Sequence, residues 1–113
     1  MTMKIYHNPR CSKSRQTLEL LQNKGHNPEV VEYLKHPLGE AALARIAMKL
    51  PKGAQRLYRE KDAKKLGINI SGLSHEAIIE MIAADPKLME RPIVETETDA
   101  RIGRPPEDIL EIL

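Results

Sequence analysis

Apolar and polar residues alternate along the first third of the chain in the pattern of a strand, a helix and a second strand. Residues 3–7 are β-prone, residues 11–24 favour a helix that Gly25 would stop, and residues 29–34 are β-prone again. A strand, a helix and a strand within about thirty residues predict a parallel βαβ unit.

The middle of the chain has helical periodicity. Apolar residues at i, i+3, i+4 and i+7 predict one amphipathic helix, whose buried face is Leu43, Ile46, Ala47 and Leu50. Residues 54–66 form a more polar second helical segment. Ser74 is suited to cap a third helix, whose buried face is Ile78, Met81 and Ile82.

The last part of the chain returns to short strands. Residues 92–95 and 100–102 flank the turn-forming residues 97–99, and this arrangement favours a hairpin. Residues 106–113 predict a final helix that would bury Ile109, Leu110 and Leu113. The whole pattern indicates an α/β fold: one domain over residues 1–113, with a small mixed sheet and a helical insertion at about 39–85.

Composition narrows the range of partners. The 113 residues include three Tyr but no Phe or Trp, which makes base stacking hard to arrange. The formal charge of +2, from 18 basic and 16 acidic residues, gives no general attraction to nucleic acid or to a membrane. No long apolar run or signal-peptide layout is present, and one cysteine cannot form an internal disulfide. We therefore expect a cytoplasmic protein with no nucleic-acid or membrane partner.

Cys11 stands at the predicted start of a helix. The first turn of a helix has unpaired N–H groups and a partial positive charge, which favour a thiolate or a bound anion there. Arg10, Lys13 and Arg15 add positive charge, and His7 would add more if protonated. Such surroundings lower the pKa of a thiol and make it nucleophilic. The alternative, a cysteine buried in an apolar core, is disfavoured because its neighbours are Arg, Ser and Lys.

Other kinds of cysteine site do not fit the sequence. The four histidines are scattered without the ligand spacing of a zinc site, so no metal is expected. A phosphatase loop would need Arg where Thr17 stands, and a dithiol motif would need Cys where Ser14 stands. A single thiol must form any disulfide with another molecule, so the reductant has to be external.

Two arginines precede prolines in the C-terminal third, Arg91 before Pro92 and Arg104 before Pro105. A guanidinium group offers planar, permanently charged donors that suit a tetrahedral oxyanion. An arginine taken alone is more often a solvated surface residue than a ligand, and sequence spacing does not bring either one to Cys11.

Taken together, these motifs resemble the ArsC family of glutathione- and glutaredoxin-dependent arsenate reductases, over essentially the whole chain. The matching segments are residues 6–15, 17–19, 32–34, 91–94 and 103–106. The resemblance implies a thioredoxin-like (glutaredoxin-like) fold with an inserted helical region. In such a fold a cis proline commonly borders the catalytic cysteine, and Pro92 is the natural candidate.

The resemblance also implies a reaction. The Cys11 thiolate would attack arsenate and form an adduct, and glutathione would then react with this adduct. Glutaredoxin would resolve the resulting mixed disulfide as arsenite is released. Glutathione is then a co-substrate, and no bound cofactor is implied. Cys11 matches the family's nucleophile, and His7 matches the histidine that helps to ionise it.

The oxyanion-binding residues are carried over in the same way. Arg91 and Arg104 match two of the family's arginines. Arg59 is the best match for the third, with Arg56 as the alternative, because the following segment is shorter than in the family and Glu60 replaces the usual Thr. The family's loop around the cysteine is matched by Asn8, Ser14 and Arg15.

Two alternatives to arsenate reduction stay open at this point. The first is a glutathione-dependent thiol oxidoreductase of the same family with a substrate other than arsenate. The second is a redox-sensing regulatory adaptor that shares the fold, which would need a partner surface rather than converging arginines.

Overall fold

The computed structural model describes residues 2–113, which form two compact units. One unit, called here the sheet unit, comprises residues 2–36 together with residues 91–113. The other, the helical unit, is Pro37–Glu90, in the region where the sequence predicts a helical insertion.

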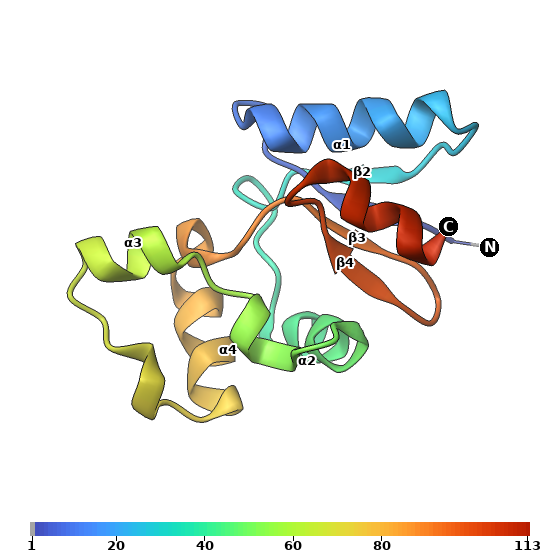
Figure 1. Cartoon of the computed structure of the whole chain (residues 1–113). Coiled ribbons are helices and arrows are strands. Elements are labelled where there is room, and N and C mark those ends of the chain that lie inside the picture. The colour runs from blue at the N-terminus through green and yellow to red at the C-terminus, as the bar shows by residue number, and fades with distance from the viewer. Residues whose placement is uncertain (1) are drawn as a thin grey trace. The chain divides into compact units, whose positions relative to one another are not determined.

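The sheet unit contains a four-stranded sheet in the order β2-β1-β3-β4 (Figure 1). β1 (Lys4–Tyr6) pairs in parallel with β2 (Glu29–Val31), and α1 (Ser12–Asn23) connects them. β1 also pairs antiparallel with β3 (Ile93–Glu95), which pairs antiparallel with β4 (Ala100–Ile102). The predicted βαβ unit and the predicted hairpin are therefore both confirmed.

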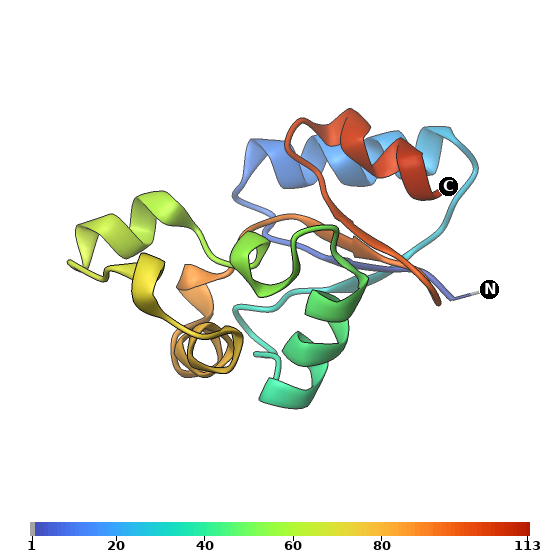
Figure 2. The ribbon, with the colours of Figure 1, turned by 60° about the horizontal axis from the view of Figure 1, so that its bottom comes forward.

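One hydrophobic cluster of the sheet unit lies on one face of this sheet. α1 and the 3₁₀ helix η4 (Pro106–Ile112) run side by side over that face in both views (Figures 1 and 2). Ile5 and Val94, paired across β1 and β3, pack with Leu21 of α1 and Ile109 of η4, and all four are fully buried. Burying each such side chain contributes about 1.5–3 kcal/mol relative to exposure, so this cluster fixes α1 against the strands.

The C-terminal helix differs from the sequence prediction. η4 is a 3₁₀ helix, in which residues three apart lie on the same side. Pro106 and Ile109 are buried and Ile112 is partly buried, whereas Leu110 is 38% exposed and Leu113 is 40% exposed. The expectation that Leu110 and Leu113 are buried was wrong, because it assumed the 3.6-residue period of an α-helix.

The helical unit consists of short helices joined by turns. α2 (Glu40–Lys49) and the following Leu50 bury all four apolar residues of the predicted face. The polar segment 54–66 is divided between the 3₁₀ helix η1 (Gly53–Arg56) and α3 (Glu60–Lys65). Two further 3₁₀ turns, η2 (Ile70–Gly72) and η3 (Pro86–Leu88), flank the next helix.

That next helix, α4 (His75–Ala84), begins where the sequence predicts it. The Ser74 hydroxyl oxygen accepts a hydrogen bond from the N–H of Ala77 at 3.1 Å, so Ser74 is the N-cap. Ile78 and Ile82 are buried as expected, whereas Met81 is only partly buried and Ile79 is buried in addition. Among residues 2–113, none of the helices combines the length and the apolar character that crossing a membrane requires.

Candidate active site

Cys11 is the N-cap residue of α1 and has extended backbone geometry, with φ of −94° and ψ of 122°. Its N–H donates to the carbonyl of Asn8 at 3.0 Å, and its carbonyl accepts from the N–H of Arg15 at 3.0 Å. The backbone hydrogen bonds of Cys11 are thus committed to the turn and the helix. Its side chain is partly buried and stands at the helix N-terminus, where the sequence predicts it.

A hydrogen-bonded turn holds the residues that precede the helix. The Asn8 side-chain oxygen accepts from the N–H of Arg10 at 3.0 Å, and the Asn8 N–H donates to the Ser14 hydroxyl at 3.0 Å. Ser14 is fully buried in the first turns of α1. Asn8 and Ser14 therefore shape the loop that presents the cysteine.

Arg91 precedes β3 and Arg104 follows β4, so the two arginines lie together at the open end of the hairpin, beside the sulfur. Nη2 of Arg104 donates to Sγ of Cys11 at 3.4 Å, and its Nε donates to the carbonyl of Arg91 at 2.7 Å. The Arg91 side chain also acts on the thiol and lowers the pKa of Cys11. The structure thus brings together one thiol and two guanidinium groups that lie far apart in the sequence.

The peptide bonds next to both arginines are cis. The Arg91–Pro92 bond has the cis form that was expected of it. The Arg104–Pro105 bond is cis as well, a form that was not predicted from the sequence.

The surroundings of Cys11 favour its ionised form. Partial burial acts to raise the pKa of Cys11, but several donors outweigh it and leave the pKa below its ordinary value. Hydrogen bonding from the Ser14 N–H, the Arg91 side chain and the Lys13 N–H lowers the pKa, and the positive charge of Arg104 lowers it further. The helix N-terminus and the two arginines therefore act on the same sulfur.

His7 lies at the end of β1 and is buried, with 7% of its surface exposed. Its N–H donates to the carbonyl of Val31 at 2.8 Å, and its Nδ1 is 2.6 Å from the Ser14 hydroxyl. Burial lowers the pKa of His7, with the Glu32 carboxylate raising it and Arg15 lowering it, and the net direction is downward. His7 is thus mostly uncharged at neutral pH, and its contact with the cysteine loop runs through Ser14.

The other three cationic residues of the loop, Arg10, Lys13 and Arg15, do not share one role. Arg15 is exposed, and its Nη1 donates to the carbonyl of Pro9 at 2.8 Å, which braces the loop from outside. Arg10 is also exposed. Lys13 contributes through its backbone, since its N–H lowers the pKa of Cys11.

Arg59 and Arg56 belong to the helical unit. Arg59 is the N-cap residue of α3, and its guanidinium pairs with Asp62 at 3.1 Å and with Glu90 at 3.8 Å. Arg56 is the last residue of η1. The assignment of Arg59 as the third oxyanion-binding arginine, with Arg56 as the alternative, stays a prediction from the resemblance.

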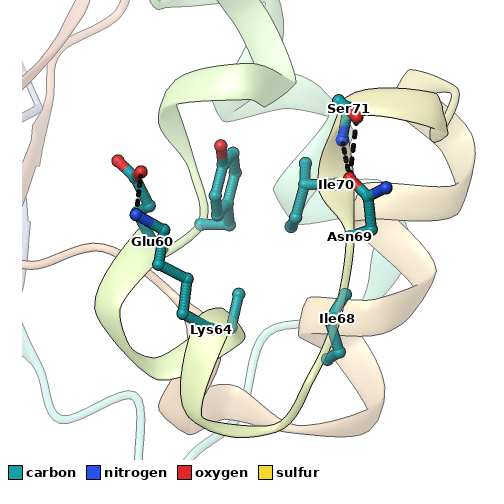
Figure 3. Close-up of a pocket in the computed structure, with 8 residues that line it drawn as sticks. Glu60, Lys64, Ile68, Asn69, Ile70 and Ser71 are labelled. Carbon is teal, nitrogen blue, oxygen red and sulfur yellow. Dashed lines mark hydrogen bonds and ion pairs between the residues drawn. The ribbon is translucent and has the colours of Figure 1, made fainter.

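A pocket of about 360 Å³ lies within the helical unit, at α3 and η2 (Figure 3). The polar side chains labelled in Figure 3 form an ion pair and hydrogen bonds with one another. Glu60 pairs with Lys64 at 3.0 Å, and the Asn69 side-chain oxygen accepts from both the N–H and the hydroxyl of Ser71. Tyr58 and isoleucines supply its apolar walls. This pocket contains neither a thiol nor a guanidinium group, so the candidate chemistry stays at Cys11.

Sequence reasoning missed one contact near the site, between Gly103 and Thr17. The position of Gly103 directly before Arg104 was the available signal, but only the fold shows that it lies against α1. No group of three or more His, Cys, Asp or Glu side chains within residues 2–113 is arranged to hold a metal ion.

Comparison with known proteins assigns the chain to a family. Residues 6–112 match the model of the ArsC family. The chain belongs to the ArsC family. Within it, the "Arsenate reductase" of Haemophilus influenzae is 44% identical over 116 residues and is covered completely, as is this chain. The "Uncharacterized protein YfgD" of Escherichia coli K12 is 52% identical over 115 residues, which cover 98% of this chain and 96% of that protein.

A solved structure of another family member agrees with the fold described above. The structure named "Arsenate reductase from Vibrio cholerae" is 45% identical and superposes with a TM-score of 0.90. The match covers 100% of this chain and 98% of that one. The ArsC chain described here therefore has a thioredoxin-like fold, as expected.

Proposed function

We propose that this chain reduces arsenate to arsenite, with the Cys11 thiolate as nucleophile and glutathione and glutaredoxin as the external reductants. The observation that carries the proposal is the Cys11 sulfur at the start of α1, with Nη2 of Arg104 at 3.4 Å and the pKa of the thiol lowered. The names of the arsenate reductases of Haemophilus influenzae and Vibrio cholerae support the choice of substrate.

In the first step the thiolate attacks arsenic. A sulfur–arsenic bond forms, and one arsenate oxygen takes up protons and leaves as water. Arsenic stays in the +5 state, so this step is a substitution and not a reduction. Arg91 and Arg104 would neutralise the oxyanion charge, and charge-assisted hydrogen bonds of this kind contribute about 1.5–3 kcal/mol each.

Reduction occurs in the second step. The glutathione thiolate forms a bond to the Cys11 sulfur, the sulfur–arsenic bond breaks, and its electron pair remains on arsenic. Arsenic is thereby reduced from +5 to +3 and leaves as arsenite, while the two sulfurs are oxidised to a mixed disulfide. Because the chain has one cysteine, the second sulfur has to come from another molecule.

The third step regenerates the enzyme. A glutaredoxin thiolate attacks the glutathione sulfur of the mixed disulfide, and Cys11 leaves as a thiolate. The donors that lower the pKa of Cys11 also make it a good leaving group here, because a thiol of lower pKa leaves faster.

The test is arsenite release by the purified chain, supplied with arsenate, glutathione and glutaredoxin, beside the Cys11→Ser variant. The proposal predicts steady release by the wild type and none by the variant. Equal yields from both would remove the reductase assignment. Release with a thioredoxin system and none with glutathione would contradict the proposed reductants. Turnover of glutathione-linked disulfides without arsenite would indicate a different substrate.

A further inference from the structure

Gly103 lies where the chain leaves β4 and turns toward Arg104. Its N–H donates to the carbonyl of Pro92 at 2.9 Å, and the N–H of Arg104 donates to the carbonyl of Ile102 at 2.9 Å. The second bond closes a tight three-residue turn centred on Gly103. The φ angle of Gly103 is not positive, so its backbone conformation alone does not require glycine.

Glycine is required at position 103 because a side chain there would not fit. A Cβ atom at position 103 would overlap Oγ1 of Thr17 and would stand 3.0 Å from Cγ of Pro92 and 3.1 Å from Cγ2 of Thr17. Thr17 is fully buried on α1, and its Oγ1 donates to the carbonyl of Lys13 at 2.8 Å. Thr17 therefore cannot turn aside without losing that bond. The backbone of Gly103 rests directly on the helix that Cys11 caps.

We propose that the contact between Gly103 and Thr17 sets the position of Arg104 against the Cys11 sulfur, which makes Gly103 a positioning residue. Arg104 follows Gly103 directly, and its guanidinium bridges the Arg91 carbonyl and the sulfur. A side chain at position 103 would separate the end of β4 from α1 and carry Arg104 away from Cys11. The importance of this contact for turnover rests on the proposed function, but the contact itself can be tested on the thiol alone.

The test begins with Gly103→Ala and two readouts that need no arsenate. One is the pH dependence of the alkylation of Cys11 by iodoacetamide, and the other is the protection of Cys11 by sulfate. If Arg104 moves away, the alkylation midpoint rises by about 0.5–1 pH unit, because a stabilising charge is lost. Sulfate protection weakens about tenfold, the equivalent of roughly one charge-assisted hydrogen bond.

Two double variants separate steric displacement from a general disturbance. Gly103→Ala with Thr17→Ala removes the two opposing atoms of Thr17, including the one that overlaps, and leaves only the looser approach to Pro92, so its midpoint and sulfate protection should return close to those of Thr17→Ala alone. Gly103→Ala with Thr17→Val should not recover, because valine keeps the shape of threonine. Both double variants lose the hydrogen bond to the Lys13 carbonyl, so they differ only in the volume at position 17.

An unchanged alkylation profile and unchanged sulfate protection in Gly103→Ala would overturn the positioning role. Equal recovery with Thr17→Ala and with Thr17→Val would overturn it as well. If Gly103→Ala alone does not fold, the two double variants are compared directly. Recovery with Thr17→Ala and none with Thr17→Val supports the positioning role, and equal behaviour of the two overturns it. A wild-type chain that releases no arsenite would overturn the proposed function and leave this test intact, because neither readout uses arsenate.

Discussion

At the scale of single residues, the chemistry of this chain depends on the environment of one sulfur atom. Burial of Cys11 opposes ionisation, and two backbone N–H groups and two arginines outweigh it. The backbone contribution follows from the position of Cys11 as N-cap and was expected from the sequence. The contribution of Arg91 and Arg104 was expected only from the resemblance to the ArsC family and not from their spacing, because these arginines reach the sulfur through the pairing of β3 with β4.

The first prediction concerns Arg104. Arg104→Gln removes a positive charge 3.4 Å from the sulfur and should raise the pKa of Cys11. A rise of about one unit would slow alkylation about tenfold at a pH well below the wild-type midpoint. The measurement is the alkylation rate of Cys11 against pH.

The matched control is Arg101→Gln. Arg101 lies on the same hairpin, but it pairs with Glu111 at 2.9 Å rather than with the sulfur. Its variant should keep the wild-type profile. If Arg101→Gln and Arg104→Gln shift the midpoint equally, the contact between Arg104 and the sulfur is not the cause.

The second prediction concerns His7 and the pH dependence of stability. Burial lowers the pKa of His7, so the unfolded chain takes up a proton there before the folded chain does. His7 therefore favours the folded state above its unfolded-state pKa of about 6.5, and this contribution is lost as the pH falls further. Denaturant unfolding from neutral pH downward should show the loss.

The His7→Gln variant should have a shallower dependence of unfolding free energy on pH below neutrality. His36→Gln, at an exposed histidine, is the control and should keep the wild-type slope. A wild-type slope in His7→Gln would show that His7 is not the titrating group.

At the scale of elements, most of the fold could be predicted because its signals are local. The βαβ unit, the hairpin, the buried face of α2 and the Ser74 cap all follow from residues adjacent in sequence. The 3₁₀ geometry of η4 could not be predicted, since its period depends on the tertiary packing that buries Pro106 and Ile109. The cis Arg104–Pro105 bond and the contact between Gly103 and Thr17 depend on long-range packing in the same way.

The third prediction tests one of these local signals. Ser74→Ala removes the hydroxyl that caps α4 and should lower the free energy of unfolding by about 1 kcal/mol. Ser74→Asp keeps a capping oxygen and places a negative charge at the helix N-terminus, so it should retain the stability. Thermal unfolding of the two variants beside the wild type provides the measurement. Equal loss in both would show that the cap is not what stabilises α4.

At the scale of the whole molecule, having a single cysteine means that the chain depends on thiols of other molecules for reduction. With glutathione and arsenate present and glutaredoxin withheld, the proposed cycle stops at the mixed disulfide. The fourth prediction is therefore that the chain accumulates with one glutathione on Cys11, as seen by intact-mass spectrometry. Cys11→Ser should gain none. Arsenite release without any glutathione adduct would show that arsenic is reduced by another route.

The central claim is that Cys11 is held as a thiolate by the start of α1 and by Arg91 and Arg104. Because the chain has one cysteine, the ultraviolet absorbance of the thiolate, measured against pH with Cys11→Ser as the blank, reports on this sulfur alone. The account predicts a midpoint clearly below the value of about 8.5 for a free thiol. A midpoint at or above that value would contradict it.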